Sequence, residues 1–172
     1  MILQGDILRL ARRAGACVRI RDLEQAKTDH EVAQLMFKHF DFCAEKHFPP
    51  NIFCVKHEKI LAQNGIYVNA CADLQGHGKY ALIGTTRATL NASDYAIIIV
   101  YLKDMASLHI KASNHAIVLV EAYDSAEVAL SLSDQSRATI ILRNNAQLHC
   151  DKTNGYLRII NHKDGKGTDI QD

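Results

Sequence analysis

Four side chains that are good zinc ligands lie on either side of a Pro-Pro pair. They are Cys43, His47, Cys54 and His57, with the spacings Cys-x3-His and Cys-x2-His. Thiolates and imidazoles this close in sequence can build a small structural zinc site, but the spacing matches no standard zinc finger. In the alternative arrangement both cysteines pack in helices and both histidines are ordinary surface or boundary residues. We expect this second arrangement, with no cofactor, and keep a zinc-stabilised interaction module as the alternative.

A second set of polar side chains recurs in the C-terminal half. His109 and His149 hold the same place in a repeating pattern, and one face carries them together with Arg87, Lys111, Glu127 and Asp151. A flat polar ladder of this kind could bind a glycan, a small anion or a protein, or it could be an unconstrained solvated face. No pair of carboxylates recurs in register, which argues against glycoside cleavage by two acids. We therefore expect no catalytic residues and no enzyme, with a carbohydrate-binding or carbohydrate-active protein as an alternative.

The element that positions these side chains is a ten-residue repeat. Every tenth residue from position 94 is Asp or Asn, which gives Asp94, Asp104, Asn114, Asp124, Asp134, Asn144 and Asn154. Between these positions apolar residues alternate with period two, as in Ala96, Ile98 and Val100, and this is typical of a β-strand. Asp and Asn tolerate left-handed backbone, which suits a corner. Each repeat is therefore expected to form one strand and one corner.

The outward-facing residues, which alternate with the apolar ones, predict how many strands make a coil. Their character alternates from one unit to the next, so that Ile97 and Ile99 are followed by Ser107 and His109. This pattern repeats every twenty residues, which predicts a two-sided parallel β-solenoid. Four coils at about 4.8 Å would make a stack about 19 Å long, with His109 and His149 about 9.6 Å apart.

One outward face of this solenoid is apolar. It is expected to carry Leu157 together with the candidate interface residues Ile97, Ile99, Ile117, Leu119 and Ile159. An aliphatic surface of this size should not stay in contact with water. We expect either the N-terminal helical stripe or a second subunit to cover it. A protein partner or a homo-oligomer is therefore predicted.

The repeat units resemble a known class of protein. The segments DMASLHIKAS, NHAIVLVEAY and NNAQLHCDKT are similar to decapeptide-repeat β-solenoids of bacteria, their phages and mobile elements. The resemblance covers about residues 28–161, including the lead-in FDFCAEKHFPPN. It implies the solenoid fold and a phage or mobile-element origin, and it implies no established activity. A non-enzymatic structural or binding module is the function that it favours.

The first part of the chain is predicted to be helical. Helices are expected from Asp6 to Ala14, from a Thr28 cap through Cys43, and from Asn51 to Leu61, with a brief strand at 17–20. The stripe of the second helix is apolar at helical spacing. Because the start of a solenoid exposes its core, residues 1–65 are placed to cap it. The predicted domains are thus a helical cap at 1–65, a solenoid at 66–161 and a polar tail at 162–172.

Composition sets further limits on function. The formal net charge of +1 gives no strong electrostatic case for a nucleic-acid or membrane partner. No apolar run approaches the roughly 18–20 residues that cross a bilayer. Five cysteines, an odd number without paired spacing, favour free thiols in a reducing cytoplasm. We therefore expect a cytoplasmic protein that binds neither nucleic acid nor membrane.

Overall fold

The computed structural model describes residues 3–16, 20–162 and 168–171 and divides the chain into two compact units, 1–66 and 67–172. The first unit holds six helices among its described residues: α1 (Leu3–Arg13), α2 (Ile20–Gln25), α3 (Asp29–Lys38), α4 (Phe40–Glu45), α5 (Asn51–Lys56) and α6 (Glu58–Gln63). None of the described helices is long and apolar enough to span a membrane. The boundary between the units lies one residue beyond the predicted one.

Local caps explain where the helices begin and end. The Thr28 side chain accepts a hydrogen bond from the Glu31 N–H at 3.1 Å, as the predicted cap requires. The single helix expected through Cys43 is broken at His39, whose backbone (φ −122°, ψ 35°) leaves the helical region. The helix expected at 51–61 breaks in the same way at His57. Of the strand expected at 17–20, residues 17–19 lie outside the described residues and Ile20 begins α2.

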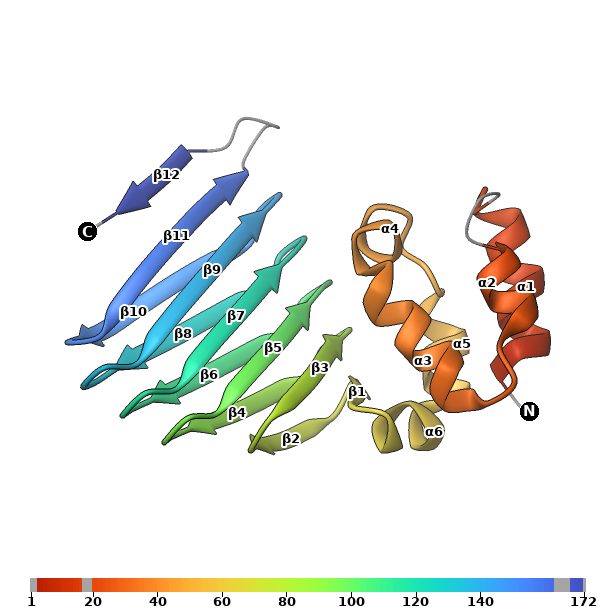
Figure 1. The fold of residues 1–172 in the computed structure, drawn as a ribbon. Coiled ribbons are helices and arrows are strands. Elements are labelled where there is room, and N and C mark those ends of the chain that lie inside the picture. The colour runs from red at the N-terminus through yellow and green to blue at the C-terminus, as the bar shows by residue number, and fades with distance from the viewer. Residues whose placement is uncertain (1–2, 17–19, 163–167, 172) are drawn as a thin grey trace. The chain divides into compact units, whose positions relative to one another are not determined.

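The second unit is a two-sided parallel β-solenoid, as the repeat predicts (Figure 1). Sheet A has the strand order β1-β3-β5-β7-β9-β11-β12, and sheet B has the order β10-β8-β6-β4-β2. The strands of sheet A are β1 (Ile66–Val68), β3 (Gly78–Ile83), β5 (Ile97–Leu102), β7 (Ile117–Ala122), β9 (Arg137–Arg143), β11 (Tyr156–His162) and β12 (Thr168–Gln171). Those of sheet B are β2 (Cys71–Gln75), β4 (Arg87–Ala92), β6 (Ser107–Ala112), β8 (Glu127–Leu132) and β10 (Gln147–Thr153).

Successive coils are twenty residues apart through most of the stack. Ile98 pairs with Val118, and Val118 pairs with Ala138, in parallel register. Sheet B contributes one strand to each coil, so its five strands make about five coils. The predicted number of four coils was too low, because β1 and β2 already belong to the stack although they precede the regular Asp/Asn series.

The core of the solenoid is the inward parity that the sequence indicates. Ile98, Val100, Val118 and Val120 are at most 1% exposed. The corner residues that follow each Asp or Asn by two positions are small and buried, including Ala106, Ala116, Ala126, Ser136 and Ala146. Ser136 satisfies its buried hydroxyl by donating to the Ser133 carbonyl at 2.6 Å, so a polar group is tolerated in this row of alanines.

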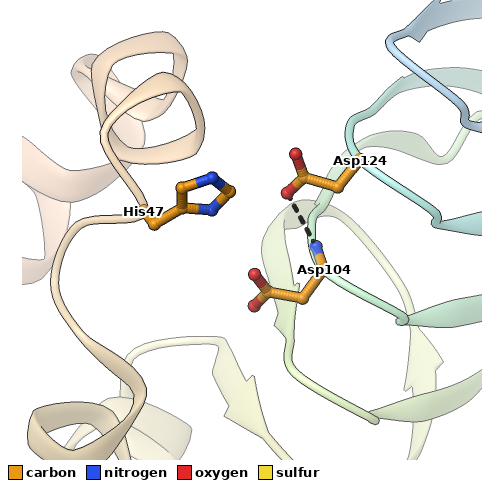
Figure 2. Close-up of side chains that lie close together, drawn as sticks. All are labelled: His47, Asp104 and Asp124. Atoms are coloured by element: carbon orange, nitrogen blue, oxygen red, sulfur yellow. Dashed lines mark hydrogen bonds between the residues drawn. The ribbon is translucent and has the colours of Figure 1, made fainter.

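The corners turn through left-handed backbone at the predicted positions. Six of the seven Asp and Asn residues have φ between +56° and +64°, from Asp94 to Asn144. Their side chains also join one coil to the next. Asp104 accepts a hydrogen bond from the Gly84 N–H at 2.9 Å, and Asp124 accepts one from the Asp104 N–H at 3.0 Å. Figure 2 shows the Asp104–Asp124 step of this ladder.

Position 84 is the place in the repeat where Asp or Asn is expected, but it holds glycine because the Asn69 side chain lies too close for a Cβ. Gly84 has φ +72°, and a Cβ added there would clash with the Asn69 side chain. Asn69 itself has φ +49°, and its Oδ1 accepts the Thr85 N–H at 3.0 Å. Asn69 therefore ends the ladder although it lies outside the ten-residue spacing.

The last coil departs from the repeat. A bulge shifts the register of β10 between Cys150 and Lys152, and β11 then pairs nineteen residues back, with Tyr156 beside Arg137. Asn154 is accordingly absent from the residues with positive φ, and Tyr156, expected inward, is 52% exposed. The tail predicted to be merely polar contains β12, which pairs antiparallel with β11 at the end of sheet A.

The buried corner alanines predict sensitivity to side-chain size. Ala116 is 0% exposed and lies between Ala96 and Ser136 in the stack, so Ala116→Leu should lower the free energy of unfolding by about 1–3 kcal/mol through overpacking. The matched control is Ala129→Leu, which makes the same change on the outer side of sheet B and should leave the melting temperature unchanged. Equal melting of Ala116→Leu and the wild type would contradict the inward assignment.

The Asp ladder predicts a second effect on stability. Asp124→Ala removes the acceptor of the Asp104 N–H and of the Asn144 side-chain amide, and it forces alanine into left-handed backbone. The expected loss is about 2 kcal/mol in chemical denaturation. Asp124→Asn keeps an acceptor and tolerates the backbone, so it should lose much less. If the two variants had the same midpoint, the ladder would not stabilise the stack.

Candidate functional site: the outward faces of the solenoid

The zinc ligands suggested by the sequence are not gathered into one site. Cys43, His47, Cys54 and His57 are all described, and no three of them bring ligand atoms within reach of a common ion. The Cys54 thiol instead lies 3.7 Å from the Pro49 carbonyl, and the His57 Nε2 lies 3.3 Å from the Asp6 carboxylate. The structure therefore gives no support to the alternative of a zinc-stabilised module.

The carboxylate that faces His57 has a structural role in the helical unit. The Asp6 Oδ2 contacts both Lys56 Nζ, at 2.6 Å, and the buried His57. The hydrogen bond from Lys56, followed by that from His57, lowers the pKa of Asp6 below its usual value. The Phe53 ring covers His57 with a centroid distance of 4.6 Å. These contacts tie α5 to α1 and explain why the imidazole is buried.

Sheet B carries the predicted polar face. By the polar face we mean the outward residues of β4, β6, β8 and β10, of which Arg87, His109, Lys111, Glu127 and His149 were predicted as binding residues. All five are exposed. His109 pairs with Ala129, and Ala129 pairs with His149, so one strand separates the two imidazoles. Ser107 separates Arg87 from Glu127 in the same way.

Asp151, the sixth predicted member, departs from this register. It occupies the bulge of β10, and Lys152 takes the expected place beside Ser131. Nothing in the ten-residue spacing marks an inserted residue here, because Asn154 and Tyr156 still match the pattern by type. The polar face is thus a ladder of separated groups, suited to contacts spread along an extended ligand.

Sheet A carries the apolar strip, by which we mean Ile97, Ile99, Ile117 and Leu119. Ile97 pairs with Ile117, and Ile99 pairs with Leu119, so the four side chains form a block on two adjacent strands. Ile97 is 56% exposed and Ile117 is 45% exposed. Whether the helical stripe or a second subunit covers this strip stays a prediction.

Leu157 and Ile159, expected outward on this face, are placed on the inner side of sheet A. Ile159 pairs with the buried Ile140 and packs against the core, because the nineteen-residue step reverses the parity of β11. Ile160 takes the outward place beside Ile141. The sequence placed Ile141 outward but missed the exchange of Ile159 for Ile160, because neither the bulge in β10 nor the shortened corner before β11 is visible in the spacing.

A tyrosine and a carboxylate border the apolar strip. Tyr101 pairs with Glu121 across β5 and β7, and Tyr123 donates its hydroxyl hydrogen to Glu121 at 2.9 Å. Burial, followed by the negative charge of Glu121, raises the pKa of Tyr101 above its usual value. The phenol therefore stays neutral at physiological pH. Hydrogen-bonding groups thus follow the apolar strip toward the C-terminal ends of β5 and β7, and Arg137 and Thr139 of β9 border it where they pair with Ile117 and Leu119.

The comparisons with known proteins found no matching family model, curated protein or solved structure. The resemblance to decapeptide-repeat β-solenoids of bacteria, phages and mobile elements therefore stays a prediction at the level of the family, while the solenoid fold is observed.

Proposed function

We propose that the protein is a non-enzymatic structural or binding module whose solenoid presents fixed side-chain faces to a protein partner. The observation that carries the proposal is the half-exposed apolar strip on a regular, paired sheet. Ile97 and Ile117 alternate with buried residues that are at most 7% exposed, so the strand backbone holds them outward. Covering them with protein would remove apolar surface from water, at a gain of about 25 cal/mol per Å².

The partner that we propose is a second copy of the chain. A flat sheet face can pack against the same face of another subunit about a twofold axis, and twofold dimers are the commonest soluble oligomers. The Tyr101 phenol and the Glu121 carboxylate lie at the edge of the strip, where they could form polar contacts around an apolar centre.

A carbohydrate-binding module is the second candidate function. It is favoured by the polar ladder on sheet B and by two grooves at the ends of its strands, one of which is lined by Asn91, Lys111 and Ser131. Hydroxyl, amide and ammonium groups in a shallow groove can bond to the hydroxyls of a sugar. This candidate is compatible with the first, because the apolar strip lies on the other sheet.

The proposal predicts that the full chain self-associates through the apolar strip. Ile117→Lys replaces one of the four apolar side chains of the strip with a charged one and should convert the oligomer to a monomer, as measured by light scattering after size-exclusion chromatography. The side chain points outward, so the melting temperature of the subunit should be retained. Ser131→Lys adds the same charge to the polar face and is the matched control. A monomeric wild type, or an oligomer that Ile117→Lys leaves intact, would argue against this interface.

A further inference from the structure

A groove on the corner between sheets B and A combines an aromatic ring with hydrogen-bonding side chains. It has a volume of about 420 Å³, within the usual range of small-molecule sites, and Gln75, His77, Asn91, Ser93, Asp94 and Tyr95 are among the residues that line it. The turn between β2 and β3 forms one wall, and the corner between β4 and β5 forms the other. All of these residues belong to the solenoid unit.

Tyr95 is held as a flat platform at this groove. Its ring is 73% exposed and stacks on His115 of the next coil, with centroids 4.9 Å apart and planes inclined by 6°. Along the stack, the β2–β3 turn lies on the side of Tyr95 opposite to His115. At that turn Gly76 carries no side chain, and a Cβ added there would meet nothing within 4 Å. One face of the ring is thus supported by His115, and Tyr95 and Gly76 both line the groove.

The polar groups of the groove are fixed by the fold. The Asp94 carboxylate accepts hydrogen bonds from the Asn114 amide at 3.3 Å and from the Ser93 hydroxyl at 3.2 Å. His77 accepts the Ile97 N–H at its Nδ1, at 3.1 Å. In neutral His77 this bond places the hydrogen on Nε2, which becomes a donor. The groove therefore offers a donor and a carboxylate acceptor at set positions, and the exposed amides of Gln75 and Asn91 lie beside them.

These features together point to a neutral saccharide, and we propose that the groove binds one. A sugar ring presents C–H bonds on one face, which suit the electron-rich face of Tyr95, and hydroxyls at its edge, which suit amide and carboxylate groups. Asp94 is part of the lining, whereas none of the described residues that line this groove is Lys or Arg. This charge disfavours phosphates and other anions. The proposal rests on the binding-module function and assigns it a ligand class.

The ligand is an oligosaccharide rather than a single sugar, because a second groove continues the first. Asn91 and Ser93 line both, and the second groove, of about 290 Å³, runs on to Lys111, Ser113 and Ser131 across successive strands of sheet B. A chain of sugar units stacked at Tyr95 would extend along the ends of these strands. Affinity should therefore increase with chain length.

The test is an NMR titration of the full chain with four neutral hexasaccharides, cellohexaose, maltohexaose, laminarihexaose and hexa-N-acetylchitohexaose, and with adenosine, each at millimolar concentration. We expect at least one hexasaccharide to shift the amide signals of Gly76, His77 and Tyr95, and to bind more tightly than its disaccharide. Tyr95→Ala should weaken binding roughly tenfold or more, and Tyr95→Phe should retain it. Because Tyr95 is exposed, the melting temperature should not change; Asn91→Ala tests the same groove independently.

Ile117→Lys serves as the control that separates this proposal from the apolar interface, and it should bind the saccharide as the wild type does. Four results would overturn the saccharide site: no shift with any hexasaccharide, binding that Tyr95→Ala and Asn91→Ala leave unchanged, affinity independent of chain length, or tighter binding of adenosine than of every saccharide. None of these results bears on self-association, which light scattering measures separately.

Discussion

The turn at each corner is the constraint on which the rest of the structure depends. At the corners from Asp94 to Asn144 the chain turns onto the other sheet through one residue in left-handed backbone, which Asp and Asn adopt at low cost. When this residue recurs every ten positions, an even number, the same parity always faces inward. The backbone ladder and the buried rows of Ala106, Ala116 and Ala126 follow from that regularity. The side chains of Asp104 and Asp124 reinforce it by accepting hydrogen bonds from the preceding coil.

Because the inward side chains form the core, packing does not constrain the outward side chains. The outer faces of the two sheets can therefore carry different residue types. Sheet A carries the apolar strip that includes Ile97 and Ile117. The polar face of sheet B carries His109 and His149, with Ala129 on the strand between them. The corners form a third surface, where Tyr95 and His115 stack from coil to coil. Each surface repeats at the spacing of the strands, about 4.8 Å, which favours extended partners over compact substrates. This spacing is consistent with the binding role that we propose.

Much of the solenoid was predictable because its signal is periodic, and the exceptions occur where periodicity fails. The corner residues from Asp94 to Asn144 could be assigned from spacing alone. Asn154 matched the spacing by residue type, yet the bulge at Asp151 adds one residue to β10 and the corner before Tyr156 is two residues shorter than the others. The last step is therefore nineteen residues, and Ile160 replaces Ile159 on the outer face. Asn69 ends the ladder outside the period. The groove at Tyr95 was also missed, because it depends on residues of two different corners that only the stacking brings together.

The twenty-residue coil is tested most directly by contacts between neighbouring strands in solution. Nuclear Overhauser effects should link backbone protons of Ile98 to those of Val118, and those of Val118 to Ala138, at a spacing of twenty residues. At the last step they should link Leu157 to Ala138, at a spacing of nineteen. Contacts at a spacing of thirty, as in a three-sided coil, would contradict the fold. If Ala138 instead contacted Arg158, twenty residues away, the reversed parity of β11 would be contradicted.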